Sequence, residues 1–174
     1  ILEYAEKLAN LHVPSIESTV FSCSGTEANE VAMTMARIAT GGKGFICTNA
    51  AYHGNGGQVG KLTRVPLKNN KRKNIYSIPY PQKFRPIIAG LSEEELTLEY
   101  LKVLENTITK IHAEGVGFAG ILFCPIFANE GLPDIPSGFM QAATEMVRNA
   151  GGLVIIDEVQ SGFCRTGNWW GYQK

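Results

Sequence analysis

The sequence predicts an α/β protein built on a doubly wound, mostly parallel sheet with helices on both faces. Short apolar or β-branched runs alternate with segments of helical periodicity along the chain, which is the order of elements in such folds. One of these runs, 116–124, is apolar almost throughout, as in a strand that is covered on both faces of its sheet. Ligands of doubly wound sheets bind at the carboxyl ends of the strands, so the polar residues that follow each strand are the first candidates for a site.

Four helices are predicted from apolar periodicity and from start and stop signals. Ser92 and Glu95 have the spacing of a capping box, which satisfies free N–H groups at the start of a helix. Gly41-Gly42 and Gly151-Gly152 are expected to end helices, because glycine readily adopts the left-handed conformation found there. The predicted helices cover 1–11, 26–39, a long segment that begins at Ser92 and buries Leu101, Leu104, Ile108 and Ile111, and 137–150, with Phe139, Ala143, Met146 and Ala150 in line.

Strands are predicted where apolar or β-branched residues cluster between turn signals. The prolines at 79, 81 and 86 exclude regular structure directly after the third of these clusters. The predicted strands are 16–23, 45–47, 74–78, 116–124 and 153–156.

The composition excludes several classes of function. The 174 residues include 16 Lys+Arg and 16 Asp+Glu, and this balance gives no electrostatic footprint for nucleic acid or for an anionic membrane. No run approaches the roughly 18 apolar residues of a membrane-spanning helix. The four cysteines are scattered without CxxC spacing, so no metal site is expected. Sparse cysteines of this kind are typical of reduced thiols in a cytoplasmic protein.

Polar clusters stand at the ends of two predicted strands in the first half of the chain. Ser24, Gly25 and Thr26 open the second helix, where free backbone N–H groups and the positive end of the helix dipole favour a phosphate. An ordinary N-cap is the alternative interpretation of these residues. Tyr52 and His53 begin a Gly-rich loop, where an aromatic ring can stack on a planar ligand, although both residue types are also common in structural turns.

A third cluster lies where the last predicted strand, 153–156, runs into Asp157. A carboxylate is costly to bury without a partner, so its place predicts either a cationic group on a ligand or a metal ion. An apolar run followed by Asp-Glu also occurs in P-loop nucleotide-binding proteins. That motif requires Gly and Ser or Thr where this chain has Asn55 and Leu62, so a P-loop is excluded.

Together the three clusters resemble the class III, fold-type I aminotransferases, which use pyridoxal phosphate (PLP). The stretches that carry the resemblance are FSCSGTEANEVAMTMAR (21–37), AYHGN (51–55) and GGLVIIDEVQSGFCRTG (151–167). The segment ANEGLPDIPSGFMQAATEMVRNAGG has the position and the residue pattern of the loop and helix that the family has between the second and third stretches. The resemblance covers nearly the whole chain, and its last motif is highly specific.

The resemblance implies that the first two clusters bind the cofactor. Gly25 and Thr26, with Ser24 alongside, take the place of the family's phosphate-binding residues. Tyr52 takes the place of the aromatic residue that stacks on the pyridine ring, and His53 lies beside it.

The residues after the last strand complete the cofactor site that the resemblance implies. Asp157 matches the carboxylate that pairs with the pyridinium nitrogen and keeps it protonated. Val159 is expected to pack on the opposite face of the ring, and Gln160 to hydrogen-bond its 3′ oxygen. Because the protonated ring is the sink for carbanion electrons, loss of Asp157 is expected to slow the chemistry more than it weakens binding.

Three positions depart from the family pattern. Cys124 stands where many members have a glutamate that orients cofactor or substrate groups, so the substrate specificity is left open. Phe127 stands where glutamine is frequent and predicts a more apolar neighbourhood. Cys164 replaces the glycine of a Gly-Arg-Thr sequence, a change that is expected to leave the loop intact.

The resemblance further implies that residues 1–174 are part of a PLP-binding large domain. The N-terminal segment and the small C-terminal domain of the family are then absent from it. The lysine that holds the cofactor as a Schiff base is expected beyond Lys174, so no catalytic residue is assigned within this segment, which is expected to be inactive alone. Family members are homodimers with active sites at the interface, and a homodimer is expected here.

The predicted function is transamination, in which an amino group passes from an amine or ω-amino acid to PLP and then to a 2-oxo acid. One alternative is a phospho-lyase of the same fold, which acts on amino-alcohol phosphates and needs no acceptor. Another is a non-catalytic PLP-fold protein that serves as a binding module. Such a protein would lack the downstream lysine, whereas an enzyme would have it. The basic run 68–73 is interpreted as a solvated turn and not as a nucleic-acid site.

Overall fold

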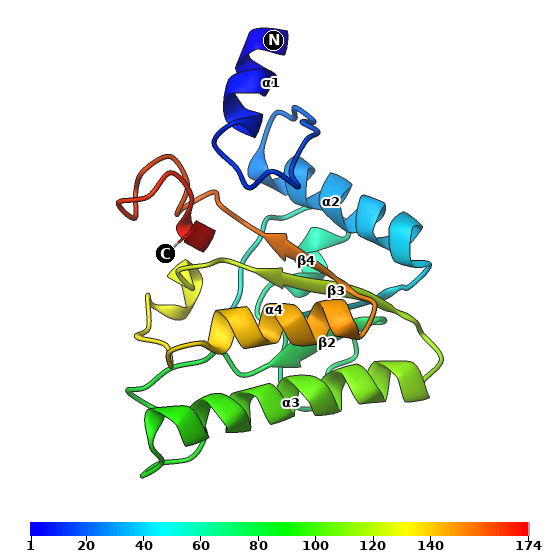
Figure 1. Ribbon diagram of the computed structural model, residues 1–174. Coiled ribbons are helices and arrows are strands. Elements are labelled where there is room, and N and C mark those ends of the chain that lie inside the picture. Colours follow the sequence, from blue (N-terminus) through cyan, green and yellow to red (C-terminus); the bar gives the residue numbers. More distant parts are fainter. Residues whose placement is uncertain (174) are drawn as a thin grey trace.

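In the computed structural model, which describes residues 1–173, a four-stranded sheet lies between helices on both of its faces (Figure 1). All strand pairs are parallel, and the order across the sheet is β2-β1-β3-β4. The strands are β1 (Gly44–Thr48), β2 (Ile75–Ile78), β3 (Phe118–Phe123) and β4 (Leu153–Ile156). The α/β class and the parallel sheet that the sequence predicts are confirmed.

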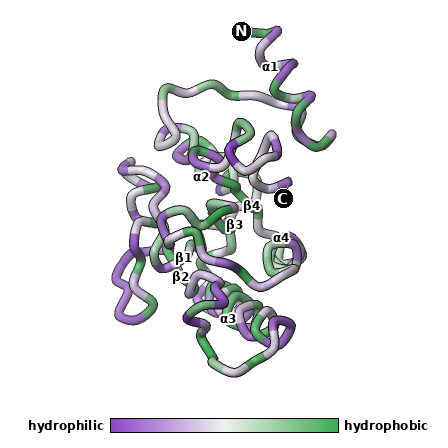
Figure 2. The backbone as a smooth tube through the Cα atoms, turned by 90° about the vertical axis from the view of Figure 1, so that its left-hand side faces the viewer, coloured by the Kyte–Doolittle hydropathy of each residue, from purple (hydrophilic) through white to green (hydrophobic). Residues whose placement is uncertain are grey.

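Two hydrophobic cores, one on each face, hold the helices to the sheet. Helix α2 (Gly25–Thr40) packs on one face, where Phe45 of β1 joins its Met33. Helices α3 (Glu93–Ala113) and α4 (Phe139–Asn149) cover the other face, where Ile46 joins Leu104. Successive side chains of a strand point to opposite faces, so neighbouring residues of β1 serve both cores. In Figure 2 the tube is largely green where β1 and β3 run between the helices.

The predicted start and stop signals of the helices are present. Ser92 accepts a hydrogen bond from the Glu95 N–H at 3.2 Å, and the Glu95 carboxylate accepts one from the Ser92 N–H at 2.8 Å, which completes the capping box of α3. Gly41 ends α2 with a φ of 68°, in the left-handed region that favours glycine. The first predicted helix is also present, as α1 (Leu2–Ala9), which lies apart from the sheet in Figure 1.

The strand predicted at 16–23 is wrong. This segment forms no ladder, and Val20 and Phe21 are 64% and 47% exposed. The β preference of such residues expresses how well they pack on a paired, half-buried surface, and this segment has no neighbouring strand to pair with in the described part of the chain. The inner face of α4 also differs slightly, since Val147 is buried with Phe139 and Ala143 whereas Met146 is only partly buried.

The strand order creates a crevice at the carboxyl edge of the sheet. From β1 the chain moves to β2 on one side and then crosses to β3 on the other side of β1. The loops that leave β1 and β3 therefore diverge, which is where ligands bind in open α/β sheets. Within residues 1–173 no helix is long and apolar enough to cross a membrane, and no group of three or more His, Cys, Asp or Glu side chains has an arrangement suited to a metal ion.

We predict that truncation of a fully buried side chain of α3 destabilises the protein. Leu104 is 0% exposed, so Leu104→Ala is expected to lower the free energy of unfolding by about 2–5 kcal/mol. Leu98 lies on the same helix and is 64% exposed, so Leu98→Ala is the matched control and is expected to change it by less than about 0.5 kcal/mol. Urea denaturation measures both values, and equal losses would contradict the packing described.

Candidate functional site

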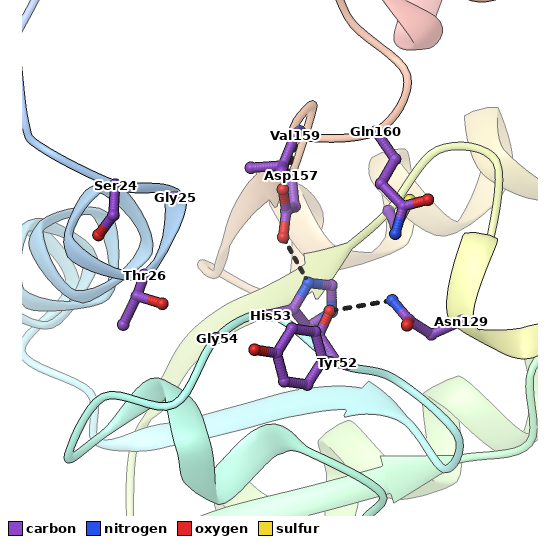
Figure 3. Close-up of a pocket in the computed structure, with 11 residues that line it drawn as sticks. Ser24, Gly25, Thr26, Tyr52, His53, Gly54, Asn129, Asp157, Val159 and Gln160 are labelled. Carbon is purple, nitrogen blue, oxygen red and sulfur yellow. Dashed lines mark hydrogen bonds and ion pairs between the residues drawn. The ribbon is translucent and has the colours of Figure 1, made fainter.

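A cavity of about 220 Å³ opens at the carboxyl ends of β1, β3 and β4 (Figure 3). All eight residues selected from the sequence line it: Ser24, Gly25, Thr26, Tyr52, His53, Asp157, Val159 and Gln160. Gly54, Cys124 and Asn129 complete the lining. The cavity is therefore built from the start of α2 and from the loops that follow three neighbouring strands.

The N-terminus of α2 forms one end of the cavity. Ser24 is its N-cap, and its hydroxyl accepts the Glu27 N–H at 3.2 Å. The N–H groups of Gly25 and Thr26 have no acceptor in the described part of the chain, because no helical carbonyl precedes them. These free donors and the positive end of the helix dipole make this end of the cavity suited to an anion.

Two glycines allow the loops to approach α2 closely. A Cβ on Gly25 would lie 2.5 Å from Cγ2 of Val159, so the Val159 side chain could not keep its present position. A Cβ on Gly54 would lie 2.4 Å from Oγ1 of Thr26, and the φ of Gly54, +124°, is one that other residues rarely adopt. Glycine at both positions therefore sets the width of the cavity.

Tyr52 projects at the wall of the cavity with 42% of its surface exposed. The side-chain amide of Asn129, from the loop after β3, donates a hydrogen bond to the backbone carbonyl of Tyr52 at 3.3 Å (Figure 3). Farther along the loop after β1, the carboxylate of Glu30 in α2 accepts the N–H groups of Gln58 and Val59 at 2.7 and 3.0 Å. The segment that carries the aromatic ring is thus anchored at both ends.

Asp157 is the buried charge of the cavity, with 8% of its surface exposed. Its Oδ2 accepts Nδ1–H of His53 at 2.8 Å and Nδ2–H of Asn29 at 3.0 Å, and its Oδ1 accepts the N–H of Val159 at 3.0 Å. An ionised carboxylate only accepts hydrogen bonds, so the proton of this contact belongs to Nδ1 of His53. Figure 3 shows the ring of His53 directed at the carboxylate.

The environment of Asp157 keeps it ionised. Burial raises the pKa of its carboxyl, but the hydrogen bonds, that from His53 foremost, outweigh this effect, and the pKa lies below its ordinary value. At the end of the neighbouring strand β3, burial raises the pKa of the Cys124 thiol, so this side chain is neutral at pH 7. The cavity therefore holds one negative charge, placed at the end of β4.

The loop after β4 is fixed by Glu158. Its carboxylate accepts the N–H groups of Gly171 and Tyr172 at 2.9 and 3.0 Å and also binds the hydroxyl of Ser161. These bonds hold the segment that contains Val159 and Gln160, both of which are exposed at the cavity.

Three functional features of the site were not predicted from the sequence. Asn29 lies inside the predicted helix 26–39 and no sequence pattern marks it, although its amide contacts Asp157. For His53 the sequence indicates only a place beside Tyr52, whereas its buried ring binds Asp157 at the base of the cavity. Asn129 gave no signal at all. The apolar neighbourhood predicted around Phe127 exists, but it is the core on the α3 side, where its ring lies 5.9 Å from that of Phe123.

This arrangement suits an elongated, planar ligand with an anionic group at one end and a protonated nitrogen at the other. The free N–H groups of α2 favour the anion. The carboxylate of Asp157 favours the cationic nitrogen, and Tyr52 and Val159 supply surfaces for a ring between them.

Comparisons with known proteins give the same family for the whole chain. The family model described as aminotransferase class III matches residues 1–174. The mitochondrial alanine–glyoxylate aminotransferase 2 homolog 2 of Arabidopsis thaliana is 33% identical over 175 residues, which cover 99% of this chain and 35% of the relative. The chain thus spans about a third of the length of that relative.

Solved structures agree with this assignment. A phospholyase from Arthrobacter in complex with phosphoethanolamine is 36% identical, with a TM-score of 0.88 over 99% of this chain and 41% of its own. A thermostable (S)-enantioselective ω-transaminase from Thermomicrobium roseum is 29% identical, with a TM-score of 0.87 over 99% of this chain and 40% of its own. Since the family model matches from the first residue to the last, the chain belongs to the class III aminotransferase family.

Proposed function

We propose that this chain forms most of the PLP pocket of a transaminase, which moves an amino group from an amine or ω-amino acid to a 2-oxo acid. The observation that carries the proposal is the ionised, buried Asp157 at one end of the cavity. The other end is the start of α2, whose first N–H groups are available to a ligand. Proteins of the class III family use PLP, whose phosphate and ring nitrogen have this pattern of charge.

The residues of the cavity fit this cofactor. The N–H groups of Gly25 and Thr26, with the hydroxyl of Ser24, would hold the phosphate. Bound PLP supplies an electron sink for a substrate carbanion.

The remaining residues would orient the ring and control its proton. Tyr52 and Val159 would bracket the ring, and Gln160 would donate to its 3′ oxygen. Asp157 would hold a proton on the ring nitrogen, because an adjacent buried carboxylate raises the pKa of that nitrogen. His53 supports this role, since its Nδ1–H donates to the carboxylate and lowers the pKa of that carboxyl.

We also propose that residues 1–174 are part of a large domain. The lysine that holds the cofactor, an N-terminal segment and a small C-terminal domain would lie outside these residues, and residues 1–174 alone would be inactive. The share of the relatives that the chain covers, 35% in one and 41% in another, supports this division.

Two further proposals concern the whole protein. A homodimer would cover apolar side chains that α2 exposes, such as Met35 and Ile38, which are 56% and 79% exposed. The four cysteines are unpaired in the structure, which supports a reducing compartment such as the cytoplasm. The Arabidopsis relative is mitochondrial by name, so cell fractionation would decide between the two compartments.

A PLP-dependent phospho-lyase is the second candidate. The 36% identity to the Arthrobacter phospholyase favours it, and so does Cys124, which lines the cavity where many transaminases of the family have a glutamate. The two reactions use the same pocket and differ in whether a 2-oxo acid is consumed.

We predict that Asp157→Asn in the full-length protein lowers turnover at least about 100-fold while the cofactor still binds, because a neutral amide no longer stabilises a protonated ring nitrogen. Asp134, whose side chain is 78% exposed, provides the matched control, and Asp134→Asn is expected to keep wild-type turnover. Steady-state kinetics and cofactor absorbance measure the two effects. Wild-type turnover in Asp157→Asn would refute the role assigned to this carboxylate.

A second prediction separates the two candidate reactions. With PLP and an amine or ω-amino acid, the full-length protein is expected to form product only when a 2-oxo acid such as pyruvate is added. With phosphoethanolamine alone it is expected to release no phosphate. Phosphate release without an acceptor would instead establish the lyase.

A further inference from the structure

We propose that Asn29 is a positioning residue that fixes the Asp157 carboxylate and joins it to the loop of His53. The inference deepens the proposed function and rests on it where catalysis is concerned. Neither a helix start nor an ordinary N-cap requires an amide at this position, because Asn29 lies in the second turn of α2 and points into the protein.

The two hydrogen bonds of the Asn29 amide determine its orientation. Nδ2 donates to Oδ2 of Asp157 at 3.0 Å and to the backbone carbonyl of His53 at 2.9 Å. Both partners are acceptors, so rotating the amide by a half turn would place its oxygen against two oxygens. The side chain is buried, with 6% of its residue surface exposed, and both N–H groups are used.

This amide determines which oxygen of Asp157 is available to a ligand. Oδ2 accepts from Asn29 and from His53, whereas Oδ1 accepts only from the Val159 N–H. An ionised carboxylate oxygen accepts about two hydrogen bonds, so Oδ1 keeps capacity for a donor in the cavity. By binding Oδ2, Asn29 leaves Oδ1 for the ring nitrogen, and its hydrogen bond stabilises the negative charge of the carboxylate.

The neutrality of Asn29 is as important as its hydrogen bonds. The titratable groups that face Asp157 are His53, from the loop after β1, and Cys124, from the end of β3. Helix α2 presents an uncharged amide to the carboxylate. An acid at this position would bring a second carboxyl within hydrogen-bonding distance of the first, and one of the two would be forced to bind a proton.

The first test is the stability of Asn29→Asp, measured by urea denaturation of the full-length protein without cofactor between pH 5 and pH 8. The carboxyl pair has a folded-state pKa raised above the unfolded value. Its contribution to stability is therefore present at low pH and is lost as pH rises. The unfolding equilibrium constant, relative to wild type, is expected to rise about tenfold per pH unit until the folded pKa of the pair is passed.

Two controls make this test specific. Asn149 is exposed at the end of α4, so Asn149→Asp is expected to show no such pH dependence. The double variant Asn29→Asp/Asp157→Asn exchanges amide and carboxylate, leaves a single charge, and is expected to remove the pH-dependent loss. A destabilisation of Asn29→Asp that is constant from pH 5 to pH 8 would overturn the proposal.

The second test addresses catalysis and also decides the matter if Asn29→Asp does not fold at any pH. In the full-length holoenzyme, Asn29→Ala is expected to lower kcat about tenfold and to leave KM for the amino donor unchanged, because the charge beside the ring is affected and the donor site is not. A raised KM with unchanged kcat would overturn the proposal. Absence of transaminase activity in the wild type would refute the proposed function alone, since the stability test needs no cofactor.

Discussion

The hydrogen bonding of one buried carboxylate is the interaction on which the rest of this site depends. An ionised group removed from water costs several kcal/mol unless nearby donors replace its hydration. Here the donors come from a helix, from a loop after β1 and from the backbone directly after β4. Each segment contributes one donor, so the same three hydrogen bonds that compensate the burial of Asp157 also bring the segments of the cavity together.

The parallel sheet makes this meeting of segments feasible. The two cores on its faces fix α2 relative to β1 and β4, and the strand order opens a crevice where the loops diverge. Within that crevice the loops come close to α2 because Gly25 and Gly54 have no side chain, and hydrogen bonds hold them there. Packing therefore sets where the polar groups lie, and the polar groups determine what can bind between them.

The sequence predicted most of the fold because its signals are local. Capping residues, glycine stops and apolar periodicity place the helices and four of the strands, and the strand ends locate the polar residues of the cavity. The prediction of a strand at 16–23 is wrong because strand pairing depends on a neighbouring strand, which no local sequence pattern reveals. The roles of Asn29 and His53 were missed for the same reason: their partner, Asp157, lies far along the chain.

These long separations have a consequence for how the protein is made. The contacts of Asp157 with His53 and Asn29 span 104 and 128 residues, and parallel strand pairing adds further non-local contacts. Chains dominated by such contacts fold slowly, because loop closure must precede the contacts that compensate it. During synthesis from the N-terminus, α2 and β1 leave the ribosome well before β4, and until β4 emerges their amide and imidazole have no carboxylate to bind. The nascent chain must therefore remain free of aggregation from the synthesis of α2 until β4 has emerged and the site can form.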